Sequence, residues 1–281
     1  MIRCSILAIW FSALSVFVSA ARSTDEAATI ALFTEEGARI TLDSEGHAVK
    51  LFSGGKPQHS VEDLQKIGTL EHLEELALNA PAAGNDDWKF LHDLSALKKL
   101  TIWHGHEFNS LEPFCDLPIE ALTVGGCMGI RDMNKEAPKK QKDAILTLTD
   151  LPNLTFLNLY HSPLAPDDAH LKHIVEHFPK LEELRLDFHA PRGFETTTTP
   201  DGLVTLQKLP LKILSLENIN SFSAEHMMAI AGIDSLESLL IDARKNPFDT
   251  EALVEAIREK RPELDIQVAG KDAKGPPRPS R

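Results

Sequence analysis

The chain has 281 residues, of which 42% are hydrophobic and 25% charged, values typical of a soluble globular protein with a sizeable core. Its formal net charge of -13 disfavours nucleic acid as a partner, because binding to phosphates requires clustered lysine and arginine. The same acidic balance disfavours broad adhesion to anionic lipid.

The first twenty residues have the pattern of a secretory signal peptide, which we assign to residues 1–20. Arg3 supplies a positive charge, an apolar run extends from Cys4 to Val18, and small residues end at Ala20. The alternative is an uncleaved membrane anchor, although the apolar run is short for a span. No other stretch is long and apolar enough to span a bilayer. We therefore expect an exported protein in the periplasm, at the cell surface or outside the cell, with no membrane span after cleavage.

The next segment, residues 21–46, is expected to form an N-terminal cap. Residues 24–36 predict a short helix. The apolar-containing segments 39–42 and 47–51 flank residues 43–46, whose sequence Asp-Ser-Glu-Gly is typical of a hairpin turn. A cap of this kind covers the exposed end of a repeat array.

A repeated pattern begins after this cap and dominates the rest of the chain. An apolar residue, two residues, a second apolar residue, two residues, a leucine, one residue and a final apolar residue recur in register. The leucines that predict successive strands are Leu76, Leu100, Leu122, Leu157, Leu184, Leu214 and Leu239. Weaker copies at the two ends are Val49-Leu51 and Leu264-Ile266-Val268.

At these residues the chain resembles the leucine-rich repeat family, over residues 47–269, in the manner of exported bacterial members with irregular, helix-bearing repeats. The resemblance implies an α/β fold, a solenoid with a curved parallel sheet on its concave face and helices on its convex face. It also implies protein–protein interaction as the usual use of such a surface. One departure is the asparagine that normally follows each strand, since His106, Ser162 and His189 lie near that place.

Helix-start signals lie between several strands. Ser60, Asp167, Ser223 and Asp249 each precede acidic residues and an apolar stripe, so each predicts the N-cap of an outer helix. The longest step between strands surrounds residues 125–149, an insertion that serves either as a tolerated surface loop or as part of a binding surface. Residues 270–281 contain Gly-Pro-Pro-Arg-Pro and are expected to be disordered.

Two cysteines remain after the expected cleavage, Cys115 and Cys127. An exported protein can pair them in a disulfide. They flank a predicted strand at its opposite ends, however, which keeps them too far apart for that bond. We favour free thiols.

The concave face is the predicted binding surface. The position after the second apolar residue of each strand forms a column that begins with Phe52 and Asn79 and ends with Asp242 and Gln267. Its first half is aromatic, with Phe52, Trp103 and Tyr160, and Phe156 lies on the same strand as Tyr160. Exposed aromatic side chains are common anchors of protein interfaces. We predict a docking patch, against the alternative that flanking loops cover these rings.

The second half of the same column is acidic. Asp187, Glu217 and Asp242 are expected on adjacent strands, where like charges are unfavourable unless they are compensated. Arg185 lies close enough to offset part of the charge. This acidic half predicts binding of a cationic partner surface or of Ca²⁺. The alternative is that its carboxylates are simply solvated.

Histidines at positions 170, 173 and 177 share one predicted helix. His173 and His177 have a spacing that places two imidazoles on one metal ion. No glutamate follows His173, and by helical angle all three face solvent, opposite Leu171 and Phe178, so a polar helix face is the preferred interpretation over a metal site.

No catalytic motif is present in the sequence, neither a Gly-x-Ser-x-Gly elbow nor a phosphate loop nor a dinucleotide fingerprint. We expect no enzymatic activity and no cofactor. The leading hypothesis is a scaffold that binds a protein partner through its concave face. A module that binds carbohydrate or cell envelope through the aromatic side chains is the second, and a metal-dependent enzyme is the third.

Overall fold

The computed structural model describes residues 24–54, 59–80, 82–105, 110–125, 143–159, 166–188, 197–219, 221–242 and 249–269. The expected signal peptide, most of the insertion at 125–149, Cys127, Tyr160, His106, Ser162, His189 and the tail from residue 270 lie outside these ranges.

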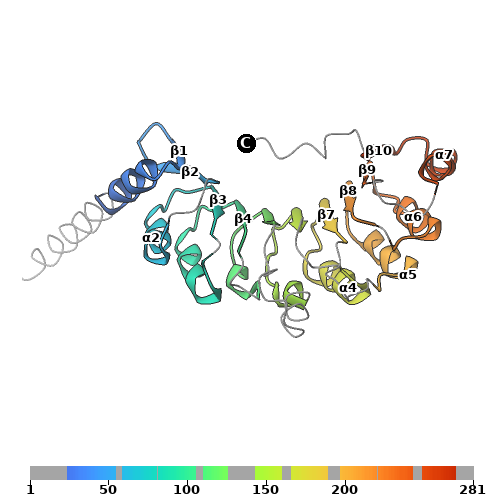
Figure 1. Cartoon of the computed structure of the whole chain (residues 1–281), viewed down its shortest axis with the longest axis horizontal. Helices are drawn as coiled ribbons and strands as arrows, with labels where there is room; N and C mark the ends of the chain where they lie inside the picture. The colour runs from blue at the N-terminus through green and yellow to red at the C-terminus, as the bar shows by residue number, and fades with distance from the viewer. Residues whose placement is uncertain are drawn as a thin grey trace, which may run out of the picture.

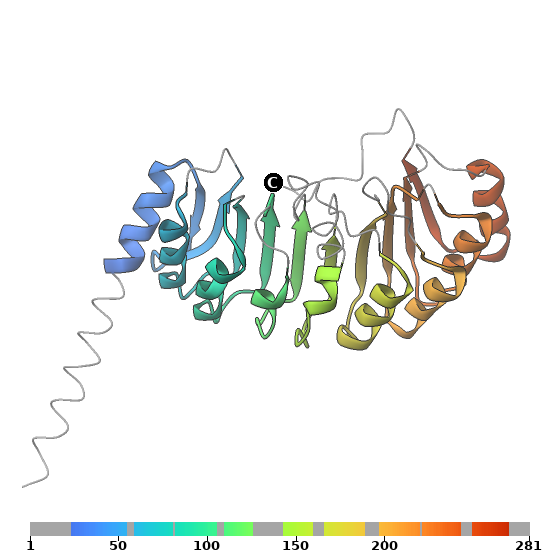
Figure 2. The same ribbon diagram turned by 60° about the horizontal axis from the view of Figure 1, so that its bottom comes forward.

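The fold is an α/β solenoid built on one curved sheet of ten strands that follow chain order from β1 to β10. Figures 1 and 2 show the strands side by side along the inner side of an arch, with the helices on its outer side. The strands are β1 Arg39–Leu42, β2 Ala48–Ser53, β3 Glu75–Asn79, β4 Lys99–Trp103, β5 Ala121–Gly125, β6 Phe156–Leu159, β7 Glu183–Asp187, β8 Ile213–Glu217, β9 Ser238–Asp242 and β10 Asp265–Ala269.

The first pair of strands differs from the rest. β1 and β2 pair antiparallel around the turn after Leu42, as the sequence predicts, and every later pair is parallel. Residues 24–35 form a helix packed on this end through buried Phe33. Glu26 accepts hydrogen bonds from the Ala48 amide at 3.0 Å and from His47 Nδ1 at 2.8 Å.

The predicted helix starts are confirmed. Ser60 caps α2 (Val61–Lys66), Asp167 caps α4 (Asp168–His177), Ser223 caps α6 (Ala224–Ala231) and Asp249 caps α7 (Thr250–Lys260). The other outer elements are α5 (Pro200–Val204) and the 3₁₀ helices η1 Ile67–Thr69, η2 Asn85–Asp93, η3 Glu112–Phe114, η4 Asp143–Thr147 and η5 Thr205–Lys208.

The core lies between the sheet and the outer helices. The seven strand leucines are at most 1% exposed, as alternate residues of each strand point inward. Where the repeats are short and the outer face is 3₁₀ helix, aromatic rings fill the space, with Trp88 and Phe114 in edge contact at 5.6 Å. Burial of one continuous leucine stack is what stabilises each repeat on its neighbours.

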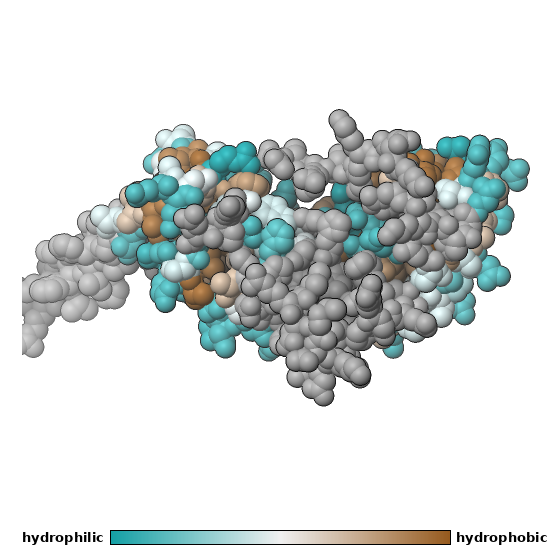
Figure 3. Space-filling view, in the orientation of Figure 1, coloured by the Kyte–Doolittle hydropathy of each residue, from teal (hydrophilic) through white to brown (hydrophobic). Residues whose placement is uncertain are grey.

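The ends of the sheet carry exposed apolar side chains. Leu42 in β1 is 47% exposed and Val268 in β10 is 39% exposed. Figure 3 shows hydrophobic surface near both ends of the arch, separated by a largely hydrophilic surface where the described residues are visible.

Candidate functional site on the concave face

Three rows of side chains cross the concave face, because alternate residues of each strand point away from the core. The first row takes the opening residue of each strand, the middle row the residue between the two buried apolar positions, and the last row the closing residue. The middle row follows from the strand pairing and consists of Arg39, Phe52, Ala77, Thr101, Thr123, Asn158, Arg185, Ser215, Leu240 and Gln267.

The pairing corrects the predicted column at both ends. Phe52 pairs with Ala77 rather than with Asn79, and Gln267 pairs with Leu240 rather than with Asp242. Both residues therefore belong to the middle row. The terminal copies of the repeat are too weak to fix their alignment, and a shift of two residues keeps the same face buried.

An aromatic cluster lies at the N-terminal end of the face. The rings of Phe52 and Trp103 are in edge contact at 5.4 Å, although a strand separates them, because the intervening middle-row residue is the small Ala77. The Arg39 guanidinium lies 4.3 Å from the centroid of the Phe52 ring. Both rings are partly exposed. The structure thus brings together two of the predicted anchors and adds Arg39, which the sequence did not indicate.

A second cluster lies at the centre of the face. Phe156 opens β6 beside Glu183, which opens β7. Arg185 donates from Nε to Glu183 at 2.6 Å, and its guanidinium lies 5.6 Å from the Phe156 ring. Arg185 therefore compensates Glu183 rather than the acids of the last row, which corrects the predicted role. Tyr160 lies outside the described residues, so the predicted aromatic patch is seen here as two separate clusters.

The acidic half of the face also differs from expectation. Asp187 and Glu217 are paired neighbours, as predicted. Asp187 is only 1% exposed, and Asn218 Nδ2 donates to it at 2.6 Å. Asn218 has a φ of 55°, so the chain turns sharply after β8 and directs this side chain back to the preceding strand. The side chain of Asp242 is not among those that the structure describes. Of the two described acids in this half of the predicted column, Asp187 is buried and Glu217 is partly exposed.

The floor between the clusters is polar, which the sequence analysis missed. Four neutral polar residues of the middle row, each less than 9% exposed, form this floor. They are Thr101 on β4, Thr123 on β5, Asn158 on β6 and Ser215 on β8. Asn158 Oδ1 is fully buried and has no hydrogen-bond partner within the described residues. An available signal was the residue between the two apolar positions of each strand, which is neutral and polar on β4, β5 and β6 in succession and again on β8.

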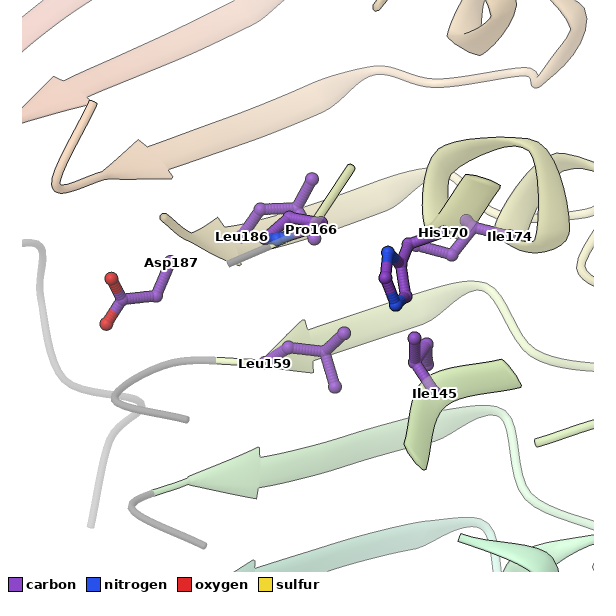
Figure 4. Close-up of a pocket in the computed structure, with 7 residues that line it drawn as sticks. All are labelled: Ile145, Leu159, Pro166, His170, Ile174, Leu186 and Asp187. Atoms are coloured by element: carbon purple, nitrogen blue, oxygen red, sulfur yellow. The ribbon is translucent and has the colours of Figure 1, made fainter. Parts of the chain in front are cut away.

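A small pocket lies behind the sheet where β6 and β7 end. Its cavity volume is about 10 Å³, which is room for about one water molecule. Figure 4 shows His170 and Asp187 toward opposite sides of this pocket, with apolar side chains between them. The lining consists of Ile145, Leu159, Pro166, His170, Ile174, Leu186 and Asp187. With five apolar residues among seven, the pocket continues the core rather than opening a polar site.

The histidines of α4 correct the prediction that all three face solvent. His170 is 1% exposed, and its Nδ1 lies 2.6 Å from Asp167 in the N-terminal cap. His173 Nε2 bonds to the Leu148 carbonyl at 2.7 Å, and burial lowers the pKa of His173. Only His177 is exposed. Two of the three therefore pack against the preceding repeat, where they act as hydrogen-bonding groups of the core.

The described ranges contain neither a cluster of metal ligands nor a membrane-spanning helix. No group of three or more His, Cys, Asp or Glu side chains there has the arrangement of a metal site. No described helix combines the length and apolar character needed to cross a membrane. Cys115 is a free thiol whose Sγ contacts the Thr147 carbonyl and the Thr149 amide, both at 3.3 Å.

No family model matches the sequence, and no curated protein matches it. Among solved structures, the leucine-rich repeat-containing protein LegL7 from Legionella pneumophila is similar, with 16% identity and a TM-score of 0.45. The match covers 74% of this chain and 69% of that one.

Proposed function

We propose that this protein is a non-enzymatic scaffold that binds a protein partner through the concave face. The observation that carries the proposal is the pair of aromatic–arginine clusters on the concave sheet face, Phe52 with Arg39 and Phe156 with Arg185. Aromatic and arginine side chains are the residues most often found at the energetic centre of protein interfaces. A solenoid offers such side chains along an extended surface that a partner can span.

A glycan ligand is the second candidate, and the cluster geometry supports it less. Sugars are recognised through exposed faces of aromatic rings. In this structure a guanidinium lies near the face of each phenylalanine, at 4.3 Å from the centroid of Phe52 and 5.6 Å from that of Phe156. Those surfaces are therefore already in contact with a cation.

Export is a further part of the proposal. Its support is the sequence of residues 1–20, with one basic residue, an apolar run and small residues before the expected cleavage after Ala20 or Ala21. N-terminal sequencing of the protein recovered from its native host tests it directly. A new N-terminus at residue 21 or 22 supports export, and an intact Met1 in the cytoplasmic fraction contradicts it.

The partner is sought by crosslinking pull-down from native envelope extract. The bait is the purified protein, compared with a variant carrying Phe52→Ala, Trp103→Ala and Phe156→Ala. The control is Leu146→Ala, which removes an apolar side chain that is 38% exposed on the outer element η4. We expect a protein that the wild type and the control capture and the triple variant does not. Equal capture by all three baits contradicts a concave site, and loss of capture after glycan digestion favours the glycan alternative.

A further inference from the structure

The central floor of the concave face contains a hydrogen-bonding group without a partner. Asn158 lies at the middle of β6 and is 3% exposed, and its Oδ1 accepts no hydrogen bond within the described part of the chain. A buried carbonyl oxygen left unpaired is unfavourable, and native proteins rarely retain one without a reason. The side chain points toward the concave side, because Leu157 and Leu159 on either side of it are buried in the core.

The neighbours of Asn158 extend this polar floor across several strands. Thr123 on β5 pairs directly with Asn158, and Thr101 pairs with Thr123. Ser215 follows on β8, beyond Arg185. The row from Thr101 to Ser215 crosses four strand spacings, a length of about 19 Å, which about six residues of extended chain cover. A peptide lying along the row meets side chains that can donate and accept hydrogen bonds over that length.

Arg185 is the middle-row neighbour of Asn158 on the adjacent strand. Its guanidinium contacts Glu183 and Phe156 instead of the carboxamide, so it does not supply the donor that Asn158 Oδ1 lacks. Its side chain is 25% exposed and long enough to rotate. Rotation of Arg185 is the movement that we expect to accompany binding of a ligand at Asn158.

The charges of the face divide between its two ends. Over β1 to β4 the described concave side chains include the cations Arg39, Lys50 and Lys99 and one anion, Glu75. Lys50 and Glu75 pair with each other at 2.6 Å, and Arg39 and Lys99 form no ion pair with any described residue. The N-terminal end of the face is therefore positive.

The opposite end is negative. Over β7 to β10 the described concave side chains include the acids Glu183, Asp187, Glu217 and Asp265, with Arg185 as the one described cation. These four acids outnumber the one cation, so this end of the face carries net negative charge. A face with opposite charge at its two ends orients a ligand of complementary polarity.

We propose that the concave face binds an extended peptide segment of the partner protein, laid across the strands, with its acidic end over β1–β4, its basic end over β7–β10 and a central backbone N–H donated to Asn158 Oδ1. A peptide supplies the missing donor at regular intervals along its length. This inference rests on the proposed function, since it specifies the chemistry of the partner at the same face.

Selection from a phage-displayed library of random 12-residue peptides against the purified protein tests the proposal. We expect enriched peptides that carry Asp and Glu in one half and Lys and Arg in the other. A peptide of the same composition with the acidic and basic residues exchanged should bind at least tenfold more weakly. Binding should also weaken as salt is raised.

Substitution separates the role of Asn158 from general effects. Asn158→Leu, similar in size, should weaken binding of the selected peptide about tenfold, and Asn158→Ala serves as a second variant of smaller volume. The matched control is Asn153→Leu, an exposed residue in the turn before β6 that accepts from Lys180. Circular dichroism checks that each variant is folded.

The outcomes distinguish this inference from the function on which it rests. Selected peptides whose affinity is unchanged by Asn158→Leu, or whose charges are mixed along their length, overturn the inference. A library that gives no binder overturns it as well, while capture of a partner that depends on Phe52, Trp103 and Phe156 leaves the proposed function standing. Absence of both kinds of binding contradicts the two proposals together.

Discussion

Truncation of Arg261 is expected to weaken the C-terminal end of the solenoid. It follows α7, is 16% exposed and ion-pairs with Glu263. Its guanidinium donates to the carbonyls of Ala231 at 3.0 Å, Ile233 at 3.0 Å, Leu236 at 3.1 Å and Asp234 at 3.4 Å. These carbonyls end α6 and lead into β9, so one side chain joins the last repeat to the one before it.

The size of the effect follows from the geometry. Each of the three shortest bonds contributes about 1 kcal/mol, and truncation leaves their carbonyls to water or unpaired, so Arg261→Ala should cost about 3 kcal/mol. If the domain unfolds as one unit, the Tm falls by about 6–12 °C. Because repeat arrays depend on contacts between neighbours, we expect the loss of protection to concentrate in residues 231–269.

Urea unfolding followed by circular dichroism measures the free energy, and hydrogen exchange locates the change. The control is Arg258→Ala, an exposed arginine on α7, which should cost less than about 0.5 kcal/mol. Arg261→Lys should recover only part of the loss, because an ammonium group keeps the charge and some donors but cannot reproduce the planar fork of the guanidinium. A difference below about 0.5 kcal/mol between Arg261→Ala and Arg258→Ala would refute this reasoning.

Three further predictions follow from other contacts. Asn158→Leu should raise the free energy of unfolding by about 1 kcal/mol or more in thermal unfolding, since a buried unpaired carbonyl oxygen is removed, and a decrease would show that the group is satisfied. Gly202→Ala places a Cβ in steric clash with the Asp168 carboxylate that accepts from Thr199, so it should destabilise the wild type. In an Asp168→Ala background the carboxylate is gone and the nearest atom of residue 168 is its Cβ at 3.1 Å, so the cost of Gly202→Ala should be much smaller. The hydrogen bond to Glu26 raises the pKa of His47, so the stabilisation from this pair is complete below the unfolded value of about 6.5 and is lost as pH rises through the raised value. Hydrogen exchange of residues 24–35 should therefore accelerate as the pH rises through that range, after correction for the intrinsic rate, and His47→Gln should remove this dependence.

The sequence alone was sufficient for the repeat architecture. The spacing of the strand leucines predicted parallel strands in chain order, and residues such as Ser60 and Asp167 predicted where helices begin. These features depend on local periodicity and on hydrogen bonds within three or four residues, so they are readable from a short window of the chain. The antiparallel hairpin before the repeats was predicted for the same reason.

The arrangement of the concave face required the tertiary structure. The alignment of Phe52 with Ala77 depends on how adjacent strands pair, and a shift of two residues leaves the buried pattern unchanged. Likewise, Arg185 pairs with Glu183, Asp187 is buried and accepts from Asn218 of the next repeat, and His170 packs against the preceding repeat. Each outcome depends on which long side chain reaches which neighbour across strands or repeats. Periodicity fixes the face on which a residue lies, but only the packed chain decides its partner and its exposure to solvent.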